Sequence, residues 1–144
     1  MYRRVKRAVD KGVSLGSLRL KGLEKKVEGR VVRIREGSAQ LDRDSSLRIA
    51  VAAKVDGVYT NRKIFFIKMK RGGISGFAKA GTADGAERVA AVIKALTGMR
   101  STVVHINNTY VLRCNERHLR TLVRYAEFAD YVERWVEGWT ASKS

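Results

Sequence analysis

The sequence predicts an α+β protein, in which an antiparallel sheet has helices on one face and follows a basic N-terminal extension. Apolar side chains alternate along residues 47–55, as in a half-buried strand, and Asp56-Gly57 then favours a two-residue hairpin turn. Two later stretches, residues 82–97 and 116–137, repeat apolar side chains at helical spacing. The 144 residues are 44% hydrophobic, which suits a single packed core with an extension.

The first 41 residues give the weakest pattern. Residues 1–12 predict a short helix, and residues 13–29 show no clear period, which indicates an extended basic connector. We then expect a hairpin in residues 27–34, a turn at Gly37 and a strand at residues 39–41.

The core is expected in the order βββα–ββα, with strands at 47–55, 58–69, 74–80, 102–106 and 110–114 and helices at 82–97 and 116–137. Thr82 or Asp84 can cap the first helix, and Gly98 ends it. Asn107-Asn108 tolerates the left-handed backbone of the second hairpin turn, and Asn115 caps the final helix.

Positive charge is concentrated in the first half of the chain. Residues 1–36 hold twelve Lys and Arg against four Asp and Glu, and residues 1–71 carry +13 of the net charge of +16. A gradient of this kind indicates a surface for a polyanion, and nucleic acid is the expected partner. We therefore divide the chain into a basic N-terminal extension, residues 1–29, and an α+β nucleic-acid-binding domain, residues 30–144. The sequence does not decide between DNA and RNA.

The candidate nucleic-acid-binding residues form three basic clusters: Arg3, Arg4, Lys6, Arg7 and Lys11; then Lys25, Lys26, Arg30, Arg33 and Arg35; then Arg62, Lys63, Lys68, Lys70 and Arg71. The first cluster suits a phosphate-binding arm or a solvated terminus. Arg33 and Arg35 share one strand face, which suits a phosphate backbone or a charged edge that resists aggregation. The third cluster surrounds Phe65 and Phe66, of which we expect one in the core and one available to stack on a base.

The predicted final helix has two apolar faces. Leu119, Leu122, Val123, Ala126 and Ala129 form one stripe, which we expect in the core. The aromatic residues Phe128, Tyr131, Trp135 and Trp139 lie on nearly the opposite side. We expect this second face to form an interface, either in a homodimer or against the chain's own N-terminal extension.

Few residues suggest catalysis, a metal or a cofactor. Asp42 and Asp44 lack a third ligand, and Cys114 has no His partner, which favours a small buried side chain. The glycine-rich run GGISGFAKAG lacks the ending of a phosphate-binding loop. We therefore expect no cofactor, no metal and a non-catalytic protein. No apolar run approaches 18 residues and no signal-peptide pattern is present, so we expect no membrane partner and a location in the cytoplasm or within a virion.

Residues 47–139 resemble the uncharacterised Pa-Rep-type proteins of hyperthermophilic archaea. The similar features are the Asp56-Gly57 hairpin, the stretch RVAAVIKALTG, the hairpin VVHINNTYVLRC and a closing helix that ends in WVEGW. The resemblance implies a thermophilic archaeal source and no particular activity. Low Gln and Cys with abundant Arg and Val agree with such a source.

A second resemblance supplies an enzymatic alternative. The order βββα–ββα is similar to the αββαββα half of LAGLIDADG homing endonucleases if residues 46–54 form a helix rather than a strand. IAVAAKVDG (Ile49–Gly57) would then stand at the family's motif, which implies a metal-binding role for Asp56. Val51 departs from the small residue of that motif, and Lys54 departs from its acidic one.

The expected function is therefore a structural, non-catalytic component of a nucleoprotein, such as a packaged genome, chromatin or a ribosome-like RNA. The alternatives are a metal-dependent endonuclease of LAGLIDADG type and a protein-interaction module whose basic surface is unrelated to nucleic acid. The state of residues 46–56 discriminates the first two, because a strand indicates the binder and a helix the nuclease.

Overall fold

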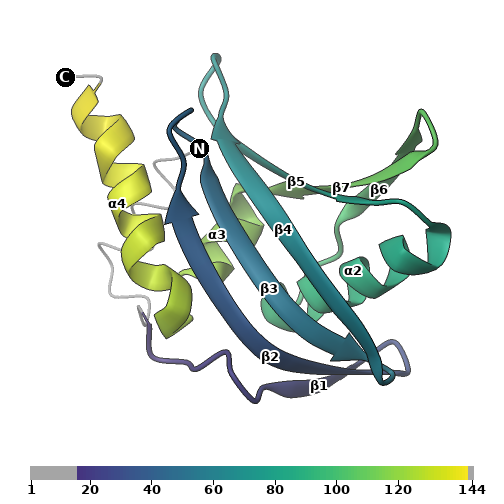
Figure 1. Cartoon of the computed structure of the whole chain (residues 1–144). Helices are drawn as coiled ribbons and strands as arrows, with labels where there is room; N and C mark the ends of the chain where they lie inside the picture. The colour runs from purple at the N-terminus through teal and green to yellow at the C-terminus, as the bar shows by residue number, and fades with distance from the viewer. Residues whose placement is uncertain (1–15, 143–144) are drawn as a thin grey trace.

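Within residues 16–142, which the computed structural model describes (side chains to residue 138), the chain forms one seven-stranded sheet and three helices (Figure 1). The strands are β1 (Glu24–Val27), β2 (Arg30–Leu41), β3 (Leu47–Val55), β4 (Val58–Lys68), β5 (Ile74–Ala80), β6 (Thr102–Ile106) and β7 (Thr109–Asn115). The helices are α2 (Ala83–Thr97), α3 (Glu116–Leu122) and α4 (Ala126–Ser142). All neighbouring strands are antiparallel, in the order β1-β2-β3-β4-β5-β7-β6, so the predicted α+β class is confirmed.

The three helices lie on one face of this sheet. Alternate residues of β3, namely Leu47, Ile49, Val51, Ala53 and Val55, are buried on that face. Helix α2 crosses behind β3 and β4 in Figure 1 and contacts six of the strands, whereas α4 packs on β2 and β3. The core therefore lies between the helices and one sheet face, and no helix of the described residues covers the other face.

The strand pattern at the start of the sheet differs from the expected one. A tight turn at Glu28-Gly29, with φ of 51° and 84°, joins β1 to β2, and β2 then continues to Leu41 with one bulge at Arg35, where its register against β3 shifts between Ile34 and Glu36. The expected turn at Gly37 is wrong, because Gly37 lies inside β2 opposite Val51. A side chain there would collide with Leu20 and would stand 3.0 Å from the Phe128 ring, so this glycine serves close packing rather than a turn.

Of residues 13–29, which were expected to form an extended connector, residues 16–21 run along the junction of α3 and α4, and Glu24–Val27 form β1 instead. Gly16 N donates to Val123 O over 3.2 Å, Leu18 N donates to Arg124 O over 3.0 Å, and Ala126 N donates to Leu18 O over 2.8 Å. These bonds attach the start of the described chain to its last two helices. The short helix expected in residues 1–12 lies outside the described residues.

The expected single final helix is two helices. α3 ends at Leu122, three residues turn the chain at Val123–Tyr125, and α4 begins at Ala126. This break changes the direction of the second apolar stripe, so that Leu119 and Phe128 are both fully buried. The single-helix prediction was wrong because a helix of constant direction cannot place both stripes in one core.

Residues 47–55 form strand β3, and Asp56 lies in the hairpin turn at φ 50°. Asp56 accepts a hydrogen bond from Val31 N over 2.8 Å through its carboxylate. The helix on which the resemblance to LAGLIDADG endonucleases depends is therefore a strand in this structure.

The sheet opens between β4 and β5. These two strands pair only where Phe65–Lys68 meets Ile74–Phe77. The first part of β4 and the last part of β5 diverge, and α2 is visible between them in Figure 1. The divergence divides the sheet into a β1–β4 part and a β5–β7–β6 part that share four residue pairs.

Candidate nucleic-acid interface

The sheet face opposite the helices, called the open face below, is rich in cations. The strand registers place on it the basic side chains of Lys26, Arg33, Arg48, Lys54, Lys63, Lys79 and Arg113. The same registers place only Glu24 and Glu36 there as acidic strand residues of the described chain. The open face therefore has the sign of charge that a phosphate backbone requires.

Most of these cations are free to bind an external anion. Glu24 pairs with Arg33 over 2.9 Å and Asp42 pairs with Arg48 over 3.1 Å. Within the described chain, Lys54, Lys63 and Lys79 form no ion pair, and Arg113 forms none either.

Two aromatic rings lie between the free cations. Phe65 and Phe77 are cross-strand partners on β4 and β5, and their ring centroids are 6.0 Å apart at an interplanar angle of 31°. Both side chains are half-buried, whereas the neighbouring Phe66 is fully buried on the helix side. The alternation of strand side chains explains why one ring of the Phe65-Phe66 pair reaches each face.

A cavity of about 370 Å³ opens beside this ring pair, where β4 and β5 diverge. Its lining consists of Asn61, Arg62, Lys63, Phe65, Phe77, Ala78 and Lys79. A second hollow of about 500 Å³ lies where β2 and β3 meet β4, beside Arg33, Arg35 and the exposed ring of Tyr59. Cations and an aromatic ring thus border each hollow.

The predicted binding residues divide between the two sides of the sheet. Arg3, Arg4, Lys6, Arg7 and Lys11 lie outside the described residues. Lys26, Arg33 and Lys63 are on the open face, Arg35 is at the β2 bulge, and Lys70 and Arg71 lie in the β4–β5 connection. Lys25 and Arg62 are exposed residues on the helix side of their strands.

Arg30 and Lys68 were expected among the phosphate-binding cations. In the structure they contact helices, Arg30 on α2 and Lys68 on α4. Arg30 Nη2 lies 2.8 Å from the Glu87 carboxylate on α2. Lys68 donates to Trp135 O over 2.8 Å, and its ammonium lies 4.8 Å from the Trp135 ring centroid. Burial lowers the pKa of Lys68 to about 8. Position 68 faces the helices because Lys68 pairs with Ile74, a residue of the buried face.

The aromatic residues expected at an interface are used largely inside the chain. Phe128 and Trp135 are 0% and 4% exposed, and Trp135 Nε1 donates to Ser45 O over 2.7 Å. Tyr131 stays exposed, and the side chain of Trp139 lies outside the described part. Phe128 and Trp135 are thus core residues and are not available for a contact between chains. The contact that α4 makes is instead with residues 16–21 of the same chain, through Glu127.

Several open-face residues escaped the sequence interpretation. These residues are Lys54, Tyr59, Phe77, Lys79 and Arg113. The sheet places Lys54 opposite Tyr59, and it places Phe77 opposite Arg113 with Lys79 two positions further along β5. The available signal was that Lys54, Phe77, Lys79 and Arg113 each stand between two buried residues of their strand, which places them on the face away from the core. Cluster counting along the chain missed it, because strands place interacting residues far apart in sequence.

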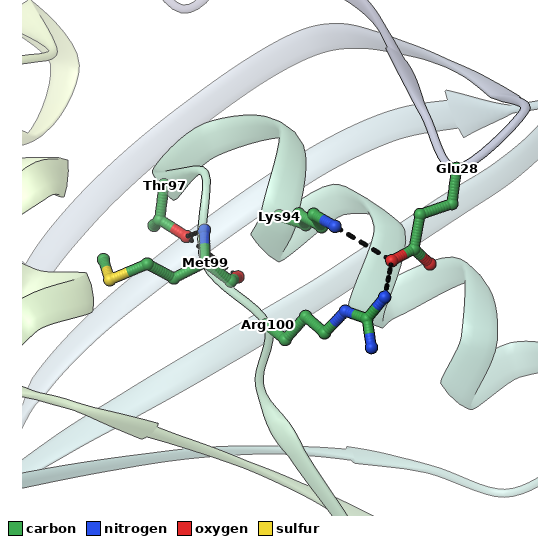
Figure 2. A network of polar contacts seen from close by, with 5 residues as sticks. All are labelled: Glu28, Lys94, Thr97, Met99 and Arg100. Atoms are coloured by element: carbon green, nitrogen blue, oxygen red, sulfur yellow. Dashed lines mark hydrogen bonds and ion pairs between the residues drawn. The ribbon is translucent and has the colours of Figure 1, made fainter.

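Glu28, in the β1–β2 turn, connects the strands to the end of α2 on the helix side. Its carboxylate lies 2.9 Å from Lys94 Nζ and 2.6 Å from Arg100 Nη2 (Figure 2). The hydrogen bonds from Lys94 and then Arg100 lower the pKa of Glu28. A cavity of about 360 Å³ borders this network, and the charges around it pair with one another. The unpaired cations of the described strands therefore lie mostly on the open face, with Lys25 and Arg62 on the helix side.

The described residues contain no group of three His, Cys, Asp or Glu that could hold a metal ion. Cys114 is buried, and burial raises the pKa of its thiol to about 12, which agrees with the expected packing role. Of the helices in the described part, none has the length and apolar character that a membrane crossing needs. Comparison with protein-family models, curated proteins and solved structures finds no match to this chain.

Proposed function

We propose that this protein binds nucleic acid through the open face of its sheet, as a non-catalytic component of a nucleoprotein. The observation that carries the proposal is the coincidence, on one uncovered sheet face, of unpaired cations with half-exposed aromatic rings. Lys63 and Lys79 flank the Phe65–Phe77 pair, and Arg113 lies opposite Phe77 on β7. Cations of this kind neutralise phosphates, while rings are used to stack bases.

The basic N-terminal arm extends the same proposal. Arg3, Arg4, Lys6, Arg7 and Lys11 would add phosphate contacts to those of the sheet. The acidic side chains of the last helix, Glu127, Asp130, Glu133 and Glu137, lie on the opposite side of the sheet. This separation would orient the open face toward a polyanion and α4 away from it.

The test compares two charge-matched double variants. Lys63→Ala/Lys79→Ala removes two open-face cations, and Arg117→Ala/Arg124→Ala removes two exposed cations of the α3 region on the helix side. We expect the first pair to reduce the slope of log K against log salt by about 1.4 for a single strand, or about 1.8 for a duplex. The second pair should leave the slope close to that of the unmodified chain.

Fluorescence anisotropy of a labelled oligonucleotide, titrated at several salt concentrations, measures these slopes. Equal slopes for the two variants would show that binding follows net charge rather than the open face. Absence of binding at low salt by the unmodified chain would reject the proposed function.

A further inference from the structure

We propose that the cavity between β4 and β5 is a base-binding cleft for single-stranded nucleic acid. This inference rests on the proposed function and makes it specific, because it names the form of nucleic acid and the part of the open face that holds an unpaired base. It depends on three features of the cleft: its unpaired strand edge, its rings and its charge.

The β4 edge in the cleft carries backbone groups that lack a neighbouring strand. Val55 and Val58 close the two-residue β3–β4 turn and hydrogen-bond to each other, so every second residue of β4 from Val58 bonds to β3. Tyr59, Asn61 and Lys63 consequently turn their N–H and C=O groups to the other side. β5 joins β4 only from Phe65 onward, so no strand of the described chain lies beside these three positions.

The protein itself satisfies one of these groups, since Arg62 Nη1 donates to Asn61 O over 2.8 Å. The backbone N–H and C=O of Lys63 form no hydrogen bond with a described residue outside the strands. At Lys63 the β4 edge therefore offers both a hydrogen-bond donor and an acceptor. A base edge exposes the same two kinds of group when it is not paired with a complementary strand.

The rings and the charge complete the cleft. Phe65 and Phe77 line it at the β4–β5 junction, and Lys63 and Lys79 line it two residues farther from the junction on each strand. Among the described residues, no acidic side chain lines it. Its volume of about 370 Å³ lies in the range of roughly 300–1,000 Å³ found for small-molecule sites, which suits a base rather than a duplex.

The chemistry of this lining selects the occupant. A duplex hides its base faces by stacking and its base edges by pairing, so it can offer the cleft only phosphates. A neutral peptide strand could pair with the β4 edge, but it would leave Lys63 and Lys79 without an anion. A single strand supplies base faces, base edges and phosphates together.

The experiment uses the full chain and four labelled ligands: a short single-stranded oligodeoxythymidylate, the corresponding oligouridylate, an abasic strand of equal length and a duplex of equal length. We expect either base-containing strand to bind about 5- to 150-fold more tightly than the abasic strand, which corresponds to one stacked base. The duplex should bind no more tightly than the single strands at equal salt.

The variants Phe65→Leu and Phe77→Leu remove a ring but keep an apolar side chain of similar size, which protects the fold. We expect each to abolish most of the preference for bases while its affinity for the abasic strand stays unchanged. Phe65→Tyr should restore the preference, because it restores a ring. Ile67→Ala is the matched control on the same face of β4, outside the cleft, and should keep the preference.

The outcomes separate this inference from the proposed function. Salt-dependent binding that is equal for abasic and base-containing strands would overturn the base cleft and leave phosphate binding by the open face intact. A base preference that survives both Leu variants, or tighter binding of the duplex, would also overturn the cleft. If none of the four ligands binds, both proposals fail.

Discussion

Individual side chains are decisive where the packing leaves no space for an alternative. Gly76 on β5 lies opposite Phe66 on β4, and the fully buried Phe66 ring covers the glycine backbone. A Cβ at position 76 would stand 2.5 Å from Phe66 Cε1. This pair is one of the four residue pairs that join the two parts of the sheet, so its packing also supports the ring pair of the open face.

Gly76→Ala should therefore destabilise the protein by about 1–3 kcal/mol, the usual cost of overpacking a core. The Phe66 ring cannot move aside without displacing other buried residues. Chemical denaturation followed by circular dichroism measures the change. Gly81→Ala is the control, because nothing lies within 4 Å of a Cβ at that position. Equal stability of the two variants would show that the ring gives way at little cost.

His118 is the second residue whose surroundings decide its behaviour. Its Nδ1 accepts from Asn115 N over 3.1 Å in the capping box of α3, and its Nε2 lies 3.1 Å from Arg100 O. The side chain is buried. Burial lowers the pKa of His118 below its ordinary 6.5, against a smaller opposite effect of the hydrogen bond to Arg100. Because its Nδ1 accepts from a backbone N–H, the neutral imidazole fits this position and the imidazolium does not.

Acidification should consequently cost stability through His118. The folded pKa lies below the unfolded one, so the unfolded chain takes up the proton first as the pH falls. The contribution is fully present above about pH 6.5 and is lost as the pH falls from there through the lower folded pKa. His118→Gln keeps an acceptor for Asn115 N but does not titrate. Between pH 7 and 5 the unmodified chain should lose stability relative to this variant. A constant difference in free energy of unfolding would contradict the assignment.

At the scale of elements, the break between α3 and α4 organises one end of the molecule. It turns α4 onto β2 and β3 and creates a place for residues 16–21 beside the junction. The Glu127 carboxylate, in the first turn of α4, accepts hydrogen bonds from Leu20 N over 3.1 Å and from Lys21 N over 3.2 Å. Glu127 therefore accepts hydrogen bonds from two backbone N–H groups of residues 16–21, a segment that pairs with no strand at Leu20 and Lys21.

Glu127→Ala should loosen this segment, because two backbone donors lose their acceptor and Leu20 is fully buried. An unpaired buried donor costs about 1–3 kcal/mol. We expect faster cleavage by trypsin after Arg19 and Lys21, together with a lower free energy of unfolding. Glu137→Ala, exposed on the same helix, is the control for lost helix charge. Cleavage at an unchanged rate would show that the other bonds of the segment suffice.

The elements also show how far the sequence alone could predict this structure. Local signals predicted β3 and its turn correctly, because strict alternation and an Asp-Gly pair depend only on neighbouring residues. The helix break and the continuous β2 depend on tertiary packing. The glycine at position 37 suggested a turn, but in the structure it lies within β2, where the lack of a side chain leaves space for Leu20 and Phe128.

The candidate site was predictable only in part for the same reason. The charge gradient and the division of Phe65 from Phe66 could be found in the sequence. The partners of Phe65 on the open face, Phe77 and Lys79, come from another strand, and no local pattern joins them. Arg30 and Lys68 carry the expected charge, but the strand registers direct them to the helices.

At the scale of the whole molecule, the described charges differ between the two sides of the sheet. The open face carries unpaired cations and few acidic residues, whereas α4, on the helix side, carries Glu127, Asp130, Glu133 and Glu137 against Arg134, although exposed cations of the α3 region lie on that side too. Such an arrangement produces a field with a direction as well as a net charge of +16. Long-range attraction would therefore bring a polyanion to the sheet first, and short-range contacts in the cleft would follow.

The N-terminal arm should strengthen this attraction without being part of the cleft. Deletion of residues 1–12 removes Arg3, Arg4, Lys6, Arg7 and Lys11 with a single carboxylate. If all five bind phosphates, the slope of log K against log salt for a single strand should decrease by about 3.5, while the ratio of affinities for base-containing and abasic strands stays constant. Thermal unfolding of the truncated chain checks that its fold is retained.

Combination with Lys63→Ala/Lys79→Ala should lower the slope by a further amount of about 1.4, because separate phosphate contacts contribute independently. Anisotropy titrations of the four proteins, unmodified, truncated, doubly substituted and combined, measure this additivity. A truncated chain with the slope of the full chain would remove the arm from phosphate binding. A truncated chain whose slope no longer responds to the two Lys substitutions would instead show that the arm is what brings nucleic acid to the open face.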